Sequence, residues 1–452
     1  MRETPLSKLG ESRVLRAFMP IINAHNEQVA AAARQAGHIE PLEVGPGDDC
    51  AVLAAPAPGQ RTVVTTDTLV EDQDFMNLWP GGIARAGEGG EFILEPARSS
   101  GYDVGRKAAT QNLADVAAMG ARPASLFISL SLPGSTPYGW IDGFAHGIVD
   151  GINACGATEC VIGGGDIGDS TEMSVTVTAL GYTDRAVLLR SGARPGDTIA
   201  LAGRTAWSDA GLRLLLNPLS LPATALLRAI AAGQDAESAL GVVAQAWEKK
   251  QAEGSGALPT GPLPEGLIEL ARTLTPEDAA HMIAVCERAV ASQHHPVSPI
   301  PAGEVARQHQ ASSMLDLSDG LVKDAGRVAA ASGVQMRLDH AAVDAFAEPL
   351  LPLARLLLAI GERNEAGESP ASLARTFVLV GGEDHGLLAT FPGEVPEEFV
   401  PLGTCVADAP ERGLSAELYG AERRHNAVTG AAVVMDGRSL DGMGWEHYGA
   451  SA

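Results

Sequence analysis

Apolar and polar positions in the first 182 residues predict strands and helices that alternate along the chain. Residues 62–70, TVVTTDTLV, are rich in β-branched side chains and end at an acidic turn, which is typical of a buried strand. Over 103–119 the apolar residues recur at helical spacing, and Gly120 stands where such a helix would end. The same reasoning predicts helices over 1–20, 26–40 and 137–156, and strands over 124–133, 158–166 and 172–182. This interleaving indicates α/β or α+β layering.

A second unit begins near residue 190, after the last of these strands. Two segments interrupt the pattern. Residues 80–101 combine glycine clusters with charges and predict an inserted loop or hairpin, whereas 217–302 predict an inserted helical subdomain or a partly disordered stretch. We therefore expect two domains, residues 1–184 and 185–452, each with one insertion. The elements predicted for the second are a strand within 190–203, a helix over 208–216, a strand, turn and helix over 312–334, and two strands around GGED within 376–391.

Charge and cysteine content narrow the class of protein. Asp and Glu outnumber Lys and Arg by 56 to 32, for a net charge of −24, which argues against binding to nucleic acid or to an anionic membrane. The five scattered cysteines fit reduced thiols rather than a disulfide framework. The polar N-terminus has no signal-peptide pattern, and no apolar run reaches the roughly 18 residues of a membrane span. We expect a soluble, cytoplasmic protein.

Aspartates beside small or polar residues recur at the ends of apolar segments. A carboxylate at such a place is costly to bury unless it meets donors or a cation, and hard oxygen ligands of this kind suit Mg²⁺ bound together with phosphate. The five instances are Gly47-Asp48-Asp49, Thr65-Thr66-Asp67, Asn112-Leu113-Ala114-Asp115, Gly163-Gly164-Gly165-Asp166 and Asp316-Leu317-Ser318-Asp319.

Each instance also has a simpler interpretation when it is taken alone. Asp49 could close a turn, Asp319 could cap a helix that starts at Gly320, and Asp115 could belong to an exposed polar stripe. The three glycines that precede Asp166 could form a tight turn or a cradle of backbone N–H groups for phosphate. The set of five, without a matching Lys or Arg cluster, favours phosphates bridged by metal ions.

The common nucleotide and hydrolase motifs are absent. The sequence has no GxxxxGK[ST], no HRD and DFG pair, no GxSxG and no HExxH. These absences exclude P-loop enzymes, protein kinases and the familiar serine hydrolases and zinc proteases.

The order of the remaining motifs resembles that of a known family. GDDCAVL, VVTTDTLVE, QNLADVAAMGARP, VIGGGDIGD, RSGARPGD, LDLSDGL, GGEDHGLL and a terminal GWEHY occur in the order seen in thiamine-monophosphate kinases. That family shares a superfamily with aminoimidazole ribonucleotide synthetase and selenophosphate synthetase. The match spans about 40–75, 103–216, 303–392 and the tail, and the NLxDxAAMGA and GWxHY forms favour the thiamine-monophosphate branch.

The resemblance implies a fold, a reaction and a set of site residues. It implies an N-terminal α/β domain whose sheet pairs with that of a twin subunit, a C-terminal α+β domain, and Mg²⁺-dependent transfer of the γ-phosphoryl group of ATP to thiamine monophosphate. The catalytic residues that it implies are Asp166, Arg190 and Asp319. The metal ligands that it implies are Asp49, Thr65, Thr66, Asp67, Asp115, Asp166, Asp316 and Asp319. The nucleotide contacts are Gly165, Asp166, Arg190 and Ser318, and the substrate contacts are Glu383 and Trp445.

The predicted chemistry needs no general base, because the acceptor phosphate is itself a nucleophile at neutral pH. What must be overcome is the repulsion between this phosphate and the triphosphate, which Mg²⁺ and Arg190 would reduce. We expect direct in-line transfer without a phosphoenzyme. As simpler alternatives, Arg190 could be a surface turn residue, and Trp445 could pack the tail rather than stack on the substrate.

Three departures from the family pattern qualify the resemblance. Asp74 stands where the family often has a histidine, so we do not assign it to the substrate. The common GGEDYEL is replaced by a segment in which His385 takes the aromatic position, and the two insertions lengthen the chain. The alternatives are another ATP-using superfamily member, such as aminoimidazole ribonucleotide synthetase, or a catalytically silent nucleotide-binding regulator. The intact aspartates argue against the silent regulator.

Overall fold

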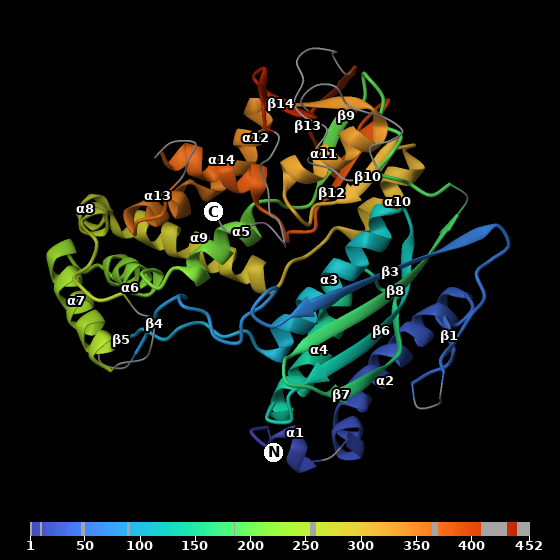
Figure 1. Cartoon of the computed structure of the whole chain (residues 1–452), viewed down its shortest axis with the longest axis horizontal. Coiled ribbons are helices and arrows are strands. Elements are labelled where there is room, and N and C mark those ends of the chain that lie inside the picture. The colour runs from blue at the N-terminus through green and yellow to red at the C-terminus, as the bar shows by residue number, and fades with distance from the viewer. Residues whose placement is uncertain are drawn as a thin grey trace.

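Two large β-sheets, two small hairpins and a group of helices make up the described part of the protein (Figure 1). The computed structural model describes residues 2–9, 11–46, 50–87, 91–184, 186–253, 259–363, 369–407 and 432–440. Helix α3 (Gly101–Ala118) contacts strands of both sheets and therefore lies between them. The mixed architecture with one sheet in each half agrees with the predicted fold class.

The N-terminal sheet has four strands in the order β3-β8-β6-β7, of which only β6 and β7 run parallel. One face packs against α3 and α4 (Tyr138–Ala154), and along β8 every second residue is buried, as expected for a strand with one covered face. Helices α3 and α4 approach closely at Gly147. A Cβ at this position would lie 2.2 Å from the carbonyl oxygen of Tyr102, so the approach requires a residue without a side chain. The strands are β3 (Gln60–Val70), β6 (Arg122–Leu132), β7 (Val161–Asp169) and β8 (Ser174–Asp184).

The C-terminal sheet has seven strands in the order β10-β12-β9-β13-β11-β14-β15, all antiparallel except β11 and β14. Its core is continuous with the buried faces of helices α11 to α14. The strands are β9 (Thr198–Ala202), β10 (Ser313–Asp316), β11 (Val334–Leu338), β12 (Leu387–Phe391), β13 (Phe399–Ala407), β14 (Val433–Met435) and β15 (Arg438–Ser439). The helices are α11 (Leu321–Ser332), α12 (His340–Ala347), the 3₁₀ turn Glu348–Leu350, α13 (Leu351–Ala359) and α14 (Pro370–Val380).

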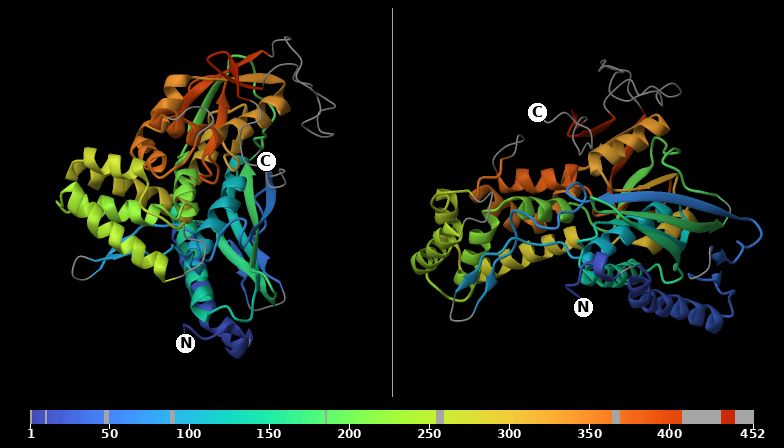
Figure 2. Two further views of the ribbon diagram at one scale, coloured as in Figure 1. Left: turned by 60° about the vertical axis from the view of Figure 1, so that its left-hand side comes forward. Right: turned by 60° about the horizontal axis from the view of Figure 1, so that its bottom comes forward.

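Both predicted insertions contribute to a helical lobe beside the sheets (Figure 2). Residues 80–101 contain the hairpin β4 (Arg85–Ala86) and β5 (Phe92–Ile93). The segment that leads into this hairpin is held against α6 (Ser220–Ala231), because the backbone N–H of Ala84 donates a hydrogen bond to Thr224 Oγ1 (2.9 Å). The described part of 217–302 is largely helical. The helices of this region are α5 (Trp207–Leu216), α6 (Ser220–Ala231), α7 (Ala236–Ala252), α8 (Glu265–Thr273), α9 (Pro276–His294) and α10 (Ile300–Gln308).

Three elements differ from the prediction. At the N-terminus α1 (Leu6–Leu9) is followed by α2 (Glu11–Ala36), which continues through Pro20 as one helix; β1 (Leu42–Val44) and β2 (Val52–Leu53) then form a small hairpin. The segment before GGED was predicted as a strand but is helix α14, started by Ser369 and Pro370 and buried along one side. The glycines before Asp166 are not in a turn, because they lie within β7.

Two further findings bear on the class of protein. In the described part of the chain no single helix has the length and hydropathy of a membrane span, although the bent pair α5 and α6 reaches those limits by length and composition alone. All five cysteines are free, and all but Cys50 are buried.

Candidate functional site

Three carboxylates from three elements meet between the two sheets. Asp67 lies on β3, Asp115 on α3, and Asp316 at the end of β10. Burial raises the pKa of Asp67, and burial together with the charge of Asp316 raises the pKa of Asp115 to about 6. Such mutual repulsion is expected where carboxylates share a partly desolvated space. We call Asp67, Asp115 and Asp316 the acid cluster.

Alternation along β3 decides which threonine joins the acid cluster. Thr65 shares the inward face with Asp67, and its Oγ1 donates a hydrogen bond to Asp115 Oδ2 (2.6 Å). Thr66 points to the other face, where its Oγ1 donates to the carbonyl oxygen of Val177 (3.1 Å). The side chains of Thr65 and Thr66 therefore do not meet at one site within the chain.

A buried histidine faces the acid cluster. His385 Nδ1 lies 3.1 Å from Asp316 Oδ2, and the residue is 5% exposed. Burial alone lowers the pKa of this imidazole, but the carboxylates around it, Asp316 first and then Glu383 and Asp115, together raise it above the ordinary value. Hence the departure from the family pattern at His385 places an imidazole that can carry a positive charge against these carboxylates.

The segment Asp316-Leu317-Ser318-Asp319 is shaped by a carboxylate further along the chain. Asp324 is fully buried, and its Oδ2 accepts the backbone N–H groups of Ser318 (3.1 Å) and Asp319 (3.0 Å). Burial raises the pKa of Asp324 to about 7, although the charge of Arg327 opposes the shift. Asp319 does not cap α11, whose N-cap is Gly320; its carboxylate pairs with Arg327 and Lys323.

The segment Gly382-Glu383-Asp384-His385 lies directly against the segment containing Ser318. The backbone N–H of Glu383 donates to the carbonyl oxygen of Ser318 (3.0 Å), and a Cβ on Gly382 would lie 2.1 Å from the same oxygen. Glu383 and His385 have φ values of 64° and 52°, a left-handed backbone that few residues adopt without support. Burial raises the pKa of Asp384 to about 7, and its carboxylate accepts the backbone N–H of Ser208 (3.1 Å).

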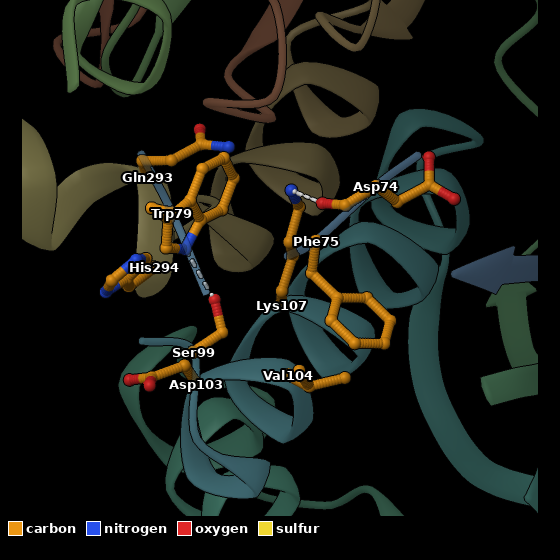
Figure 3. A pocket seen from close by; sticks show the side chains of 9 residues that line it. All are labelled: Asp74, Phe75, Trp79, Ser99, Asp103, Val104, Lys107, Gln293 and His294. Atoms are coloured by element: carbon orange, nitrogen blue, oxygen red, sulfur yellow. Dashed lines mark hydrogen bonds between the residues drawn. The ribbon is translucent and has the colours of Figure 1, made fainter. Parts of the chain in front are cut away.

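A small cavity lies between α3, α9 and the segment that follows β3 (Figure 3), and two of its lining residues, Lys107 and Gln293, contact Glu383. Its volume is about 10 Å³, room for one water molecule. Lys107 enters it from α3 and donates to the carbonyl oxygen of Asp74 (2.6 Å), while the carboxylate of Asp74 points away from Lys107. That carboxylate instead accepts the backbone N–H of Val70 (2.8 Å) and closes a turn.

The structure does not bring Asp166 to the acid cluster. Asp166 is exposed on the edge strand β7 opposite Ser129, and the register places Gly165, not Asp166, in the row of Asp67. Asp166 therefore lies on the other face and at the other edge of the sheet from Asp67. Arg190 is exposed and follows Leu189, whose carbonyl oxygen accepts the N–H of Met314 on β10 (3.0 Å).

Two predicted site residues, Asp49 and Trp445, lie outside the described residues. Their roles as metal ligand and substrate contact stay predictions.

The acid cluster fits a divalent cation that is shared with phosphate groups. Among the described residues no three His, Cys, Asp or Glu side chains form a metal site by themselves. Mg²⁺ characteristically takes one or two protein carboxylates together with phosphate oxygens and water, so a complete protein cage is not required. Burial raises the pKa of both Asp67 and Asp115, and a cation bound between them would favour their charged forms.

Sequence reasoning missed Lys107 and Asp324. Lys107 is spaced four and eight residues before Gln111 and Asp115 and so lies on the same helix face. A lysine in that setting could have been identified as a buried cation. Nothing in the sequence indicated the role of Asp324, since a carboxylate in the first turn of a helix is ordinary.

Comparisons with known proteins agree on one family. Residues 47–183 match the model of the AIR synthase related protein, N-terminal domain. The chain is 30% identical over 418 residues to the thiamine-monophosphate kinase of Mycobacterium tuberculosis (strain CDC 1551 / Oshkosh), covering 91% of this chain and 89% of that one.

Two solved structures share the fold. The thiamine-monophosphate kinase from Stenotrophomonas maltophilia K279a superposes with a TM-score of 0.53 at 22% identity, covering 91% of this chain and 96% of that one. AaThiL complexed with AMPPCP and TMP superposes with a TM-score of 0.52 at 21% identity, covering 98% and 99%.

Proposed function

The chain belongs to the thiamine-monophosphate kinase family, related to aminoimidazole ribonucleotide synthetase, and we propose that it phosphorylates thiamine monophosphate with ATP to give thiamine diphosphate. The observation that carries the proposal is the acid cluster. It lies between the sheets, beside the two segments that contain Ser318 and Glu383. A relative that binds AMPPCP and TMP supports the choice of the two substrates.

We assign roles to residues as the family resemblance implies. Mg²⁺, when bound, reduces the repulsion between the two phosphate-bearing substrates. Glu383 and Trp445 contact thiamine monophosphate, and Gly165, Asp166, Arg190 and Ser318 contact ATP. Asp166, Arg190 and Asp319 act at the reacting phosphates. The proposed metal ligands are Asp49, Thr65, Thr66, Asp67, Asp115, Asp166, Asp316 and Asp319.

The phosphoryl group passes directly from ATP to the acceptor. An oxygen of the thiamine monophosphate dianion forms a bond to the γ-phosphorus, and the bond between that phosphorus and the β,γ-bridging oxygen breaks to release ADP. The dianion has no proton to lose, so no base is required. The chain's own residues orient the two substrates: Arg190 by a bidentate contact with phosphate and Glu383 by holding the acceptor.

We expect purified protein with Mg-ATP to form ADP with thiamine monophosphate, and not with thiamine or formylglycinamidine ribonucleotide. Direct transfer requires both substrates to be bound together, so initial-rate plots should intersect. Incubation with γ-labelled ATP alone should leave no label on the protein. Label that chases into thiamine diphosphate would show a phosphoenzyme, and ADP formed only with formylglycinamidine ribonucleotide would contradict the proposed substrate.

We also propose that the protein is a homodimer formed through the N-terminal sheets. On the face turned away from α3, Val64 is 63% exposed and is the cross-strand neighbour of Leu180. Asp166 lies on the same outward face, so a second subunit is what can bring it to an acid cluster. We expect light scattering at micromolar concentration to give the mass of two chains, and a monomer would contradict the proposal.

The division of labour between the halves stays a prediction. We propose that residues 1–184 bind ATP and metal and that 185–452 form the second domain. The free cysteines support a reducing, cytoplasmic compartment for this enzyme.

A further inference from the structure

We propose that Lys107 is a positioning residue that, through Glu383, sets the affinity of the site for the organic part of the phosphate acceptor. The inference deepens the proposed function and rests on it. It starts from a pair of residues that are 276 positions apart in the sequence and meet where α3 contacts the C-terminal half.

Lys107 fixes one of the two oxygens of the Glu383 carboxylate. Its Nζ donates to Glu383 Oε2 (2.8 Å), and Gln293 Nε2 donates to the same oxygen (2.9 Å). Among the described residues Glu383 Oε1 accepts no hydrogen bond, and the Glu383 side chain is 34% exposed. One oxygen is therefore held by the protein, and the other is free for a ligand.

Lys107 itself is not positioned to touch a ligand. Its side chain is 5% exposed, and Nζ is already committed to Glu383 and to the carbonyl oxygen of Asp74 (2.6 Å). Figure 3 shows it extending from α3 into the cavity wall toward Asp74. Any effect of Lys107 on a ligand must therefore pass through Glu383.

The charge of Lys107 keeps Glu383 ionised in a partly desolvated place. Burial by itself raises the pKa of Glu383, but the charge and hydrogen bond of Lys107, together with the Gln293 hydrogen bond and the charge of His385, outweigh burial and hold the pKa below its ordinary value. The backbone of Glu383 is left-handed (φ 64°) and is anchored by its N–H to Ser318, so the carboxylate has little freedom to turn elsewhere. Charge and direction are thus both fixed before a ligand arrives.

An ionised, oriented Oε1 suits one of the two proposed substrates. Thiamine monophosphate carries a cationic thiazolium ring and an aminopyrimidine N–H donor, and a carboxylate attracts the first and accepts from the second. ATP brings a highly negative triphosphate, which gains nothing from a nearby carboxylate. Loss of Lys107 should therefore weaken the binding of thiamine monophosphate and leave the binding of ATP unchanged.

The test is a double-mutant cycle read by calorimetric binding, with thiamine monophosphate and ATP titrated separately in Mg²⁺. We expect Lys107→Met and Glu383→Gln each to weaken the binding of thiamine monophosphate roughly tenfold or more, as for a lost hydrogen bond to a charged group. The affinity for ATP should change less than about twofold. The double variant should bind thiamine monophosphate no more weakly than Glu383→Gln alone. Lys249→Met, an exposed lysine on α7, is the matched control.

Folding and function can be separated within the same cycle. Lys107→Met leaves a partly buried carboxylate without its cation and should unfold more easily, whereas the double variant removes both charges and should recover. Unchanged thiamine monophosphate affinity in Lys107→Met, or independent losses that multiply in the double variant, would overturn the role of Lys107. Failure of the wild-type protein to bind thiamine monophosphate would instead contradict the proposed function.

Discussion

Asp115→Asn is expected to lower kcat by about 100-fold or more, the scale of losing one strong electrostatic contact in an active site, without unfolding the protein. Asn keeps the shape of the side chain and can still accept the hydrogen bond from Thr65 Oγ1. It loses the charge that we propose holds Mg²⁺ beside the phosphates. The measurement is kcat at saturating Mg-ATP and thiamine monophosphate.

The same substitution should leave the metal-free protein equally stable or more stable. Because burial and the charge of Asp316 raise the pKa of Asp115 to about 6, the fold favours the protonated form of this carboxyl group. Its ionisation therefore costs stability as the pH rises from the ordinary aspartate pKa through about 6, and Asn does not ionise. Thermal unfolding of both proteins is measured between pH 5 and 7.5 without metal. The unfolding temperature of Asp115→Asn should rise relative to that of the wild type as the pH rises.

Asp166 provides the second half of this metal prediction. It is exposed on β7, so Asp166→Asn should not change stability, while kcat should fall on the same scale as for Asp115→Asn. Asp169→Asn, an exposed aspartate on the same strand, is the control and should remain active. Near-wild-type turnover in both Asp115→Asn and Asp166→Asn would rule out the metal assignment.

Asp324→Ala is expected to cost about 2–4 kcal/mol of unfolding free energy, because it leaves the Ser318 and Asp319 N–H groups without their acceptor. The carboxylate is also 2.5 Å from the Arg327 Nη1 donor, and that pair is lost too. Since these N–H groups shape the segment proposed to contact ATP and metal, kcat/KM for ATP should fall roughly tenfold or more. Urea unfolding and initial rates measure the two effects.

Asp344→Ala is the matched control for Asp324→Ala. Asp344 also pairs with an arginine, since Arg375 Nε and Nη2 donate to it at 2.7 and 3.0 Å, but its side chain is 46% exposed. An exposed pair of this kind contributes about 0–1 kcal/mol. Equal losses of stability in the two variants would contradict the structural role given to Asp324, and so would a wild-type kcat/KM for ATP in Asp324→Ala.

One error in the predicted fold comes from a short apolar run. The segment TFVLV before GGED is rich in aromatic and β-branched residues, and a run of five residues is too short to distinguish a strand from a buried helix. The structure makes it the end of α14, because Leu373, Ala374, Phe377 and Val378 all face the core of the C-terminal half. Likewise the glycines before Asp166 look like a turn in sequence but continue β7, where neighbouring β6 supplies their partners.

The sequence by itself determined the elements that carry the acid cluster and the family to which the chain belongs. The alternation of TVVTTDTLV places Thr65 and Asp67 on one face, and the order of the motifs identifies the family without any contact map. These features are local, since strand period, helix period and motif identity each depend on a few successive residues.

Only the tertiary structure decided which distant side chains work together. It paired Lys107 with Glu383 across 276 positions, set His385 against Asp316, and gave Asp324 the N–H groups of Ser318 and Asp319. It also separated Asp166 from Asp67, which the shared aspartate pattern had grouped. The physical reason is that a buried charge needs a partner or a cation, and the partner it finds depends on how the sheets and α3 pack rather than on its neighbours in sequence.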